Sequence, residues 1–256
     1  MAGDDEIPAV TKKFRELLEK TPDMNAAVAA IRSLTEVMEG SEATTMMQVQ
    51  QELQAASEQL KSDTGILSVG SGCELYRRFV TRAFLDISDF NECKRLLVQR
   101  GKKFTHATVA SRTLISKHVE SFVQDGSTLL VHGHSRVVAC ALGHAARNHK
   151  RFTVLVTESR PDNAGVAMLH RLEGVGVQGT LIMDAEVGHV MERVDMVLVG
   201  AAAVVENGGI INKIGTYQTA MVAKACNTPF FVAVESYKFT RIYPLNQSDL
   251  PSQCKQ

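Results

Sequence analysis

Short apolar runs alternate with helical stretches between residues 127 and 235, and this alternation constrains the fold more than any other feature of the sequence. The five apolar runs are Thr128–His132, Phe152–Thr157, Gln178–Met183, Val194–Gly200 and Pro229–Glu235. They are nearly continuous in Leu, Val, Ile and Phe, which is typical of strands buried on both faces. Helical segments lie between them at 136–149, 161–172 and 216–227. The pattern predicts a parallel sheet with right-handed crossovers, that is, a doubly wound, Rossmann-like α/β domain.

The first half of the chain has helical periodicity instead. Apolar residues recur at three- and four-residue steps from Met24 to Met38 and from Met46 to Leu60, and Asp63-Thr64-Gly65 closes the second run. Further helices are expected after Gly70-Ser71-Gly72 and across residues 109–122. We therefore expect an N-terminal helical domain over residues 1–125 and the Rossmann-like domain over residues 126–256.

Composition excludes several classes of protein. Apolar residues make up 45% of the 256 residues, and 28 basic residues balance 28 acidic ones, so bulk charge indicates neither a nucleic-acid nor a membrane partner. The longest uncharged apolar run, Met196–Val205, is too short to cross a bilayer, and the acidic segment Met1–Glu6 is not a signal peptide. Five cysteines without C-x-x-C spacing fit a reducing compartment. We expect a cytosolic protein.

Ligands of open parallel sheets bind beyond the carboxyl ends of the strands. We call this edge of the predicted sheet the carboxyl rim. Its charged and titratable residues are His132, His134, Arg136, Glu158, Arg160, Asp184, Lys213 and Glu235.

Two segments could bind an anion. The stretch Glu206–Thr216 supplies a glycine pair, Asn212, Lys213 and the start of a helix, so an anion site and a simple turn with a helix cap are equally good interpretations. Gly70-Ser71-Gly72 precedes a helix that carries Arg77, Arg78 and Arg82. There a capped helix with a solvated basic face is the better interpretation.

Two other patterns predict no site. Residues 174–179 match G-x-G-x-x-G, but they follow a helix and enter a strand, which reverses the order in a dinucleotide loop and predicts a helix C-cap and turn. His132, His134, Cys140 and His144 resemble metal ligands only as a list, because the first two would point to opposite sides of a strand. No metal is expected.

The segment Asn207–Gln218, with Lys224-Ala225 and Pro229–Ala233 behind it, resembles one superfamily. It holds the alpha, beta and delta subunits of translation initiation factor 2B and the sugar-phosphate isomerases that act on methylthioribose 1-phosphate or ribose 1,5-bisphosphate. Four further stretches resemble the alpha-subunit branch: Asp23–Arg32, Gly72–Phe79, His134–Val138 and Phe239–Gln247. The likeness runs from residue 20 to residue 251.

The resemblance implies a scaffold without catalysis. The isomerases use a cysteine after the first strand and an aspartate after the fourth, and the matching residues here are Gly133 and Ala202, which cannot transfer a proton. The phosphate-binding element is kept, so a sugar phosphate or nucleotide sugar is the ligand implied, and no cofactor is required. The ligand-binding residues implied are His132, Arg136, Arg160, Asp184, Asn212 and Lys213.

The resemblance also implies partners. The alpha subunit forms a homodimer through its α/β domain and bridges two copies of the beta, gamma, delta and epsilon subunits of the exchange factor for initiation factor 2. With its relatives it senses factor 2 phosphorylated on its alpha subunit, which docks on the helical domains and inhibits exchange during stress. Thr45, Glu74 and Arg78 match family positions on that face. No direct nucleic-acid or membrane partner is implied.

Family members continue beyond the segment Pro244–Pro251 with another strand and helix, so the α/β domain here is expected to lack both. Two alternative functions remain. A sugar-phosphate isomerase would need a replacement acid/base pair, for which Asp184 and His132 are the nearby candidates. A metabolite sensor would act outside the complex.

Overall fold

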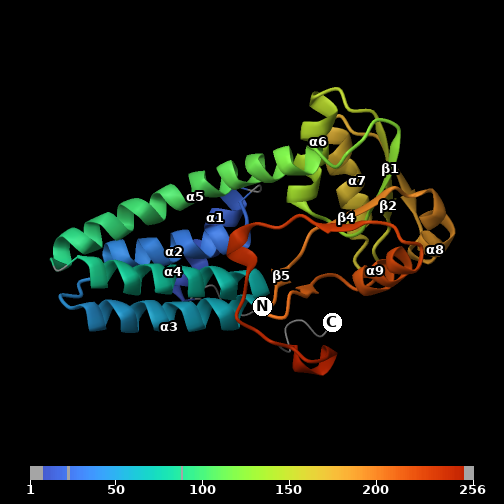
Figure 1. Ribbon diagram of the computed structural model, residues 1–256. Coiled ribbons are helices and arrows are strands. Elements are labelled where there is room, and N and C mark those ends of the chain that lie inside the picture. Colours follow the sequence, from blue (N-terminus) through green and yellow to red (C-terminus); the bar gives the residue numbers. More distant parts are fainter. Residues whose placement is uncertain (1–7, 22–23, 88, 251–256) are drawn as a thin grey trace. The chain divides into compact units, whose positions relative to one another are not determined.

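The computed structural model describes residues 8–21, 24–87 and 89–250 (Figure 1). The contacts divide them into two compact units. The helical unit runs up to Thr108 and includes Val205–Gly208 and the chain from Tyr237 onward, and the α/β unit comprises Val109–Val204 and Gly209–Ser236. The division therefore falls inside a helix, not at residue 125, and two later segments return to the helical unit.

The helices of the helical unit pack side by side around α2 (Figure 1). They are α1 (Ala9–Lys20), α2 (Ala26–Gly40), α3 (Met46–Thr64), α4 (Leu67–Asp86) and the first part of α5 (Phe90–Glu120). Asn25 caps α2, Thr45 caps α3, and Gly65 ends α3 in the left-handed conformation that favours glycine. The expected end of this helix is thus confirmed. Asp23, which was part of the resemblance, lies outside the described residues.

One predicted helix start is wrong. Helix α4 begins at Leu67, so Gly70-Ser71-Gly72 lies inside the helix and offers no helix N-terminus to an anion. The glycine at 72 serves packing instead. A Cβ at Gly72 would lie 2.7 Å from the carbonyl oxygen of Ala27 in α2, so only glycine lets the two helices approach this closely.

Two features of the helical half were not anticipated. Helix α1 buries Val10, Phe14 and Leu17, whose spacing places them on one helical face. Helix α5 is one continuous helix of 31 residues, whereas the apolar pattern indicated only its last part.

The α/β unit contains the predicted parallel sheet. Its strands are β1 (Ser127–Val131), β2 (Phe152–Thr157), β3 (Gly179–Ile182), β4 (Met196–Val199) and β7 (Phe230–Val232). They pair in parallel in the order β3-β2-β1-β4-β7, with Leu130 opposite Leu155. The predicted Rossmann-like fold is confirmed.

Helices cover both faces of this sheet because successive strand residues point to opposite sides. On one face Leu129 and Val131 pack with α6 (Arg136–Arg147), α7 (Ala164–Gly174) and the end of α5. On the other face Leu130 and Val197 pack with α8 (Val187–Val190) and α9 (Thr216–Ala225). Helix α7 ends at Gly174, and β3 begins at Gly179, so the predicted turn between them is confirmed.

A short antiparallel pair, β5 (Ala203–Val204) and β6 (Ile210–Ile211), was not anticipated. The Ala202 N–H donates a 2.8 Å hydrogen bond to the Ile211 carbonyl oxygen and extends the pairing. This pairing fixes the start of the segment Asn212–Gly215, which we call the α9 loop and which leads into α9. Within the described residues, no helix is both long enough and apolar enough to cross a membrane.

Candidate functional site

His132 lies at the centre of the carboxyl rim, directly after β1, with 2% of its surface exposed. Its Nε2 is 2.7 Å from the Ile214 carbonyl oxygen, and its Nδ1 is 2.6 Å from the Thr157 hydroxyl. A carbonyl oxygen can only accept, so Nε2 carries the hydrogen, and in the neutral ring Nδ1 accepts from Thr157. Both ring nitrogens are therefore used inside the protein, where they join β1, β2 and the α9 loop.

The α9 loop is held by its own polar groups as well. The Thr216 hydroxyl donates to the Lys213 carbonyl oxygen at 2.7 Å, and the Asn212 side-chain amide donates to that hydroxyl at 3.1 Å. Gly215 has φ +93° and lies against the His132 ring. As the N-cap of α9 it provides no capping side chain for the first N–H groups of the helix.

Lys213 reaches from the α9 loop to the loop after β2. Its ammonium group contacts the carboxylate of Asp162, and its stem passes Gly133, with Cγ 3.7 Å from where a Cβ would stand. The two charged side chains are 48% and 43% exposed. The hydrogen bond from Lys213 is the main cause that lowers the pKa of Asp162 below its ordinary value.

Asp184 anchors the loop after β2. Its carboxylate accepts hydrogen bonds from the backbone N–H groups of Ser159 (3.0 Å) and Arg160 (2.8 Å). Its Oδ1 also lies 3.9 Å from His132 Nδ1. The carboxylate thus fixes the backbone beside the site.

The two predicted arginines differ in their surroundings. Arg160 is exposed, and its Nε donates to Glu158 at 3.1 Å. Arg136 is half-buried at the start of α6. The pKa of the neighbouring His134 is lowered, first by partial burial and then by the positive charges of Arg171 and Arg136. Two arginine charges thus act on His134.

Of the six predicted ligand-binding residues, His132, Asp184, Asn212 and Lys213 form one connected group through the contacts above. Arg160 joins it through its backbone N–H. Arg136 begins α6 on the same rim. Sequence reasoning missed Asp162 and Thr157. Asp162 could have been found, because it follows a strand end as the other rim residues do.

Two positions after β1 and β4 carry no reactive side chain. Gly133 is buried with φ +74°, and its N–H donates to the Ser159 hydroxyl at 2.8 Å. Ala202 is exposed and has only a methyl group. Neither residue can give or take a proton during a reaction. Among the described residues, no group of three or more His, Cys, Asp or Glu side chains could hold a metal ion.

The three residues expected to contact a partner lie on α3 and α4. Thr45 is the exposed cap of α3, and its hydroxyl accepts from the Gln48 N–H at 3.3 Å. Glu74 and Arg78 form an exposed ion pair of 3.0 Å on α4. Gln50 of α3 contacts Thr81 of the antiparallel helix α4. Thr45 precedes Gln50 by five residues, so it lies beyond Thr81 along α4, about two helical turns from Arg78.

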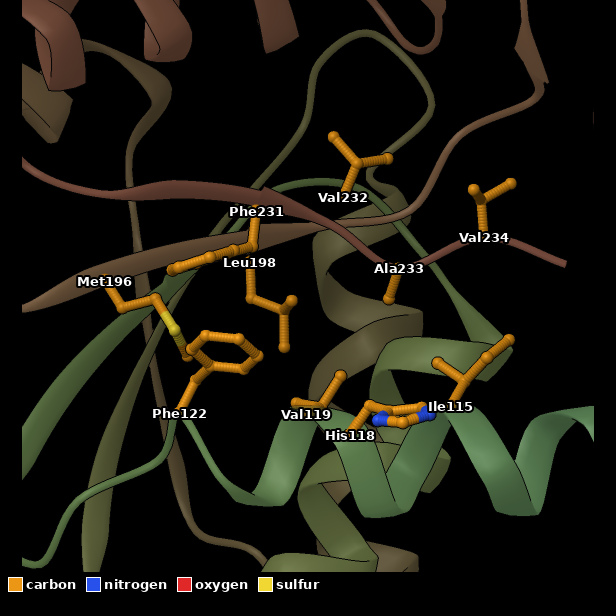
Figure 2. Close-up of a pocket in the computed structure, with 10 residues that line it drawn as sticks. All are labelled: Ile115, His118, Val119, Phe122, Met196, Leu198, Phe231, Val232, Ala233 and Val234. Carbon is orange, nitrogen blue, oxygen red and sulfur yellow. The ribbon is translucent and has the colours of Figure 1, made fainter.

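An apolar cavity of about 210 Å³ lies elsewhere in the α/β unit. Figure 2 shows three side chains of α5, Ile115, His118 and Val119, facing β4, β7 and the residues after β7. Phe122, which follows α5, lies beneath Phe231 with the ring centroids 4.8 Å apart. His118 is the one lining residue with a polar side chain. The cavity therefore lacks the cations of the carboxyl rim.

Comparison with known proteins places these features in a family. The model of the "Initiation factor 2 subunit family" matches residues 19–254. The chain belongs to this family. It is 49% identical over 244 residues to "Translation initiation factor eIF2B subunit alpha" of Dictyostelium discoideum, covering 94% of this chain and 76% of that protein. The corresponding protein of Caenorhabditis elegans is 38% identical over 96% of this chain and 82% of its own length. The resemblance to alpha subunits is confirmed.

The fold agrees with solved structures of the family. A translation initiation factor eIF-2B of Pyrococcus horikoshii superposes with a TM-score of 0.75 at 22% identity, over 95% of this chain and 84% of that one. A ribose 1,5-bisphosphate isomerase of Archaeoglobus fulgidus is 36% identical over 149 residues, which are 58% of this chain and 48% of the isomerase. Family membership and the identity to alpha subunits support a regulatory role in translation initiation.

Proposed function

We propose that the chain is a non-catalytic regulatory subunit of the guanine nucleotide exchange factor for initiation factor 2, in the position of the alpha subunit. The observation that carries the proposal is 49% identity to an alpha subunit over 94% of the chain. In this role it forms a homodimer through the α/β unit and bridges two sets of the beta, gamma, delta and epsilon subunits. It thereby helps the complex sense phosphorylated initiation factor 2 and limit translation during stress.

The absence of isomerase activity is the second part of the proposal. Gly133 and Ala202 occupy the positions that match the family's catalytic cysteine and aspartate, and neither can transfer a proton. The alternative pair, His132 and Asp184, is a poor substitute. Both ring nitrogens of His132 already bond Thr157 and Ile214, and the Asp184 carboxylate already accepts two backbone N–H groups. Purified chain should therefore not turn over ribose 1,5-bisphosphate, and turnover abolished by Asp184→Asn would contradict this.

The partner surface proposed for the phosphorylated factor is the exposed part of α3 and α4 around Thr45, Glu74 and Arg78. Arginines suit a phosphorylated partner because the guanidinium group binds phosphate oxygens with two hydrogen bonds. Arg77 is held towards α3 by a 3.2 Å hydrogen bond to Gln54, whereas Arg78 is paired with Glu74. Arg78 would exchange this intramolecular partner for the phosphorylated one.

Nucleotide-exchange assays test this regulatory role. The other four subunits exchange nucleotide on factor 2 with and without the chain, and each mixture is measured with and without phosphorylated factor 2. We expect the chain to increase the inhibition by the phosphorylated factor, and Arg78→Ala to weaken that increase. Arg95→Ala, which removes an exposed arginine of α5, is the matched control. Equal inhibition with and without the chain would contradict the proposal.

A sugar phosphate or nucleotide sugar is the proposed ligand of the carboxyl rim. Support comes from the cationic surroundings of His134, from Lys213 beside the uncapped start of α9, and from the partial similarity to an isomerase of a phosphorylated ribose. Thermal stabilisation by ribose 5-phosphate, lost in Lys213→Ala, is the expected result. The same stabilisation without any binding to the other four subunits would favour a free metabolite sensor.

A further inference from the structure

The contact between Lys213 and Asp162 joins two loops of the carboxyl rim. Lys213 belongs to the α9 loop, and Asp162 follows β2, 51 residues earlier in the chain. The ammonium group that would bind a phosphate is thus already paired with a carboxylate of the same chain. A carboxylate and a phosphate are both oxyanions, so they compete for the same donor hydrogens.

The frame on either side of this contact is fixed, and the lysine side chain is the adjustable part. His132 holds the α9 loop at Ile214, and Asp184 holds the backbone of the β2 loop at Ser159 and Arg160. Lysine carries its charge on a flexible four-carbon stem with three donor hydrogens. The ammonium group can therefore leave Asp162 for a nearby anion without movement of either loop.

Asp162 has a second partner when the lysine leaves. Its Oδ1 accepts a 3.2 Å hydrogen bond from the Ala164 N–H, at the first turn of α7. A negative charge is favourable at a helix N-terminus, so the carboxylate remains stable there. It also remains close to the site, where its charge opposes an incoming anion.

We propose that Asp162 is an internal competitor of the anion site: it holds Lys213 in the ligand-free protein, and a phosphate group must displace it. This inference rests on the proposed ligand of the carboxyl rim and adds its regulation. Asp162 raises the ligand concentration that is needed to occupy the site. The site therefore binds a phosphate ester that is abundant and stays empty when the ester is scarce.

Isothermal titration calorimetry of the full chain with ribose 5-phosphate and with inorganic phosphate tests the competition. The variants are Asp162→Asn, Lys213→Ala and the double variant. Glu192→Gln is the matched control, because it removes one negative charge at an exposed position before β4, at the opposite edge of the sheet.

Removal of the competing charge in Asp162→Asn should tighten binding of ribose 5-phosphate about threefold to fivefold, because solvent screens a pair of side chains that are nearly half exposed. Glu192→Gln should change the affinity less than about twofold, because its charge lies farther from the rim than the screening length. Lys213→Ala should weaken binding about tenfold or more. The double variant should bind more tightly than Lys213→Ala but should recover only part of the lost affinity, because it has no lysine that Asp162 could hold.

Unchanged or weaker binding by Asp162→Asn would overturn the inference, as would equal tightening in Glu192→Gln or no binding by any variant. These outcomes are separate from the proposed subunit role, which is measured by assembly with the other subunits without phosphate ligand. Assembly without any phosphate binding overturns both the proposed ligand and the competitor, whereas phosphate binding that Asp162→Asn does not tighten overturns the competitor alone. The expected affinities without assembly contradict the subunit role alone.

Discussion

Gly215 lies directly against the imidazole of His132: a Cβ added to the glycine would stand 2.7 Å from Cε1 of the ring. The contact joins the residue after β1 to the residue before α9, so the end of β1 and the start of α9 pack directly against each other. It explains why the α9 loop needs glycine at this position, both for its φ of +93° and for space.

Gly215→Ala should destabilise the α/β unit by about 3 kcal/mol, because the left-handed backbone costs about 1–2 kcal/mol and the clash with a packed ring adds about as much. Urea unfolding followed by circular dichroism measures the change. Gly176→Ala is the matched control, since Gly176 has φ +81° but open space around it. Gly176→Ala should lower the free energy of unfolding only by the backbone contribution of about 1–2 kcal/mol. Equal losses in the two variants would show that the His132 contact is unimportant.

The neutral tautomer of His132 is the second prediction. The Ile214 carbonyl oxygen requires the hydrogen on Nε2, so the nitrogen chemical shifts of the neutral ring should be those of the Nε2–H form. Heteronuclear NMR of protein with labelled histidine measures them, and His132→Asn assigns the signal. A ring with its hydrogen on Nδ1 would mean that the bond to the α9 loop is not formed.

The two glycines of α4 should respond in opposite ways. Gly72→Ala forces a methyl group to within 2.7 Å of the Ala27 carbonyl oxygen and should destabilise the helical unit by about 2 kcal/mol. Gly70→Ala meets only Lys61 atoms at 3.8 Å or more and should stabilise α4 by about 0.5–1 kcal/mol, the difference in helix propensity. Thermal unfolding of the two variants distinguishes them. Stabilisation by both would contradict the close packing of α2 and α4.

The sequence was sufficient to predict the sheet, because strands buried on both faces are continuous apolar runs bounded by turn residues. Phe152–Thr157 was predicted to the residue. Periodicity failed at α4, where Gly70 and Gly72 suggested a break. Whether a glycine ends a helix or admits a neighbouring helix depends on tertiary packing, and local sequence does not contain that information.

The candidate site was predictable in its location and less so in its contacts. Strand ends supplied His132, Asp184 and Lys213, because parallel strands bring their carboxyl ends to one edge. The partners of these residues depend on loop conformations that no pattern specifies. Asp184 bonds backbone N–H groups, and Lys213 crosses to Asp162, a residue that sequence reasoning did not select.

The measurement that tests the central claim most directly is sedimentation velocity of the purified chain, alone and mixed with the other four subunits of the exchange factor. We predict a homodimer that joins two sets of those subunits into one larger particle. A chain that stays monomeric or aggregates and leaves the sets apart would contradict the claim that it acts as the bridging subunit.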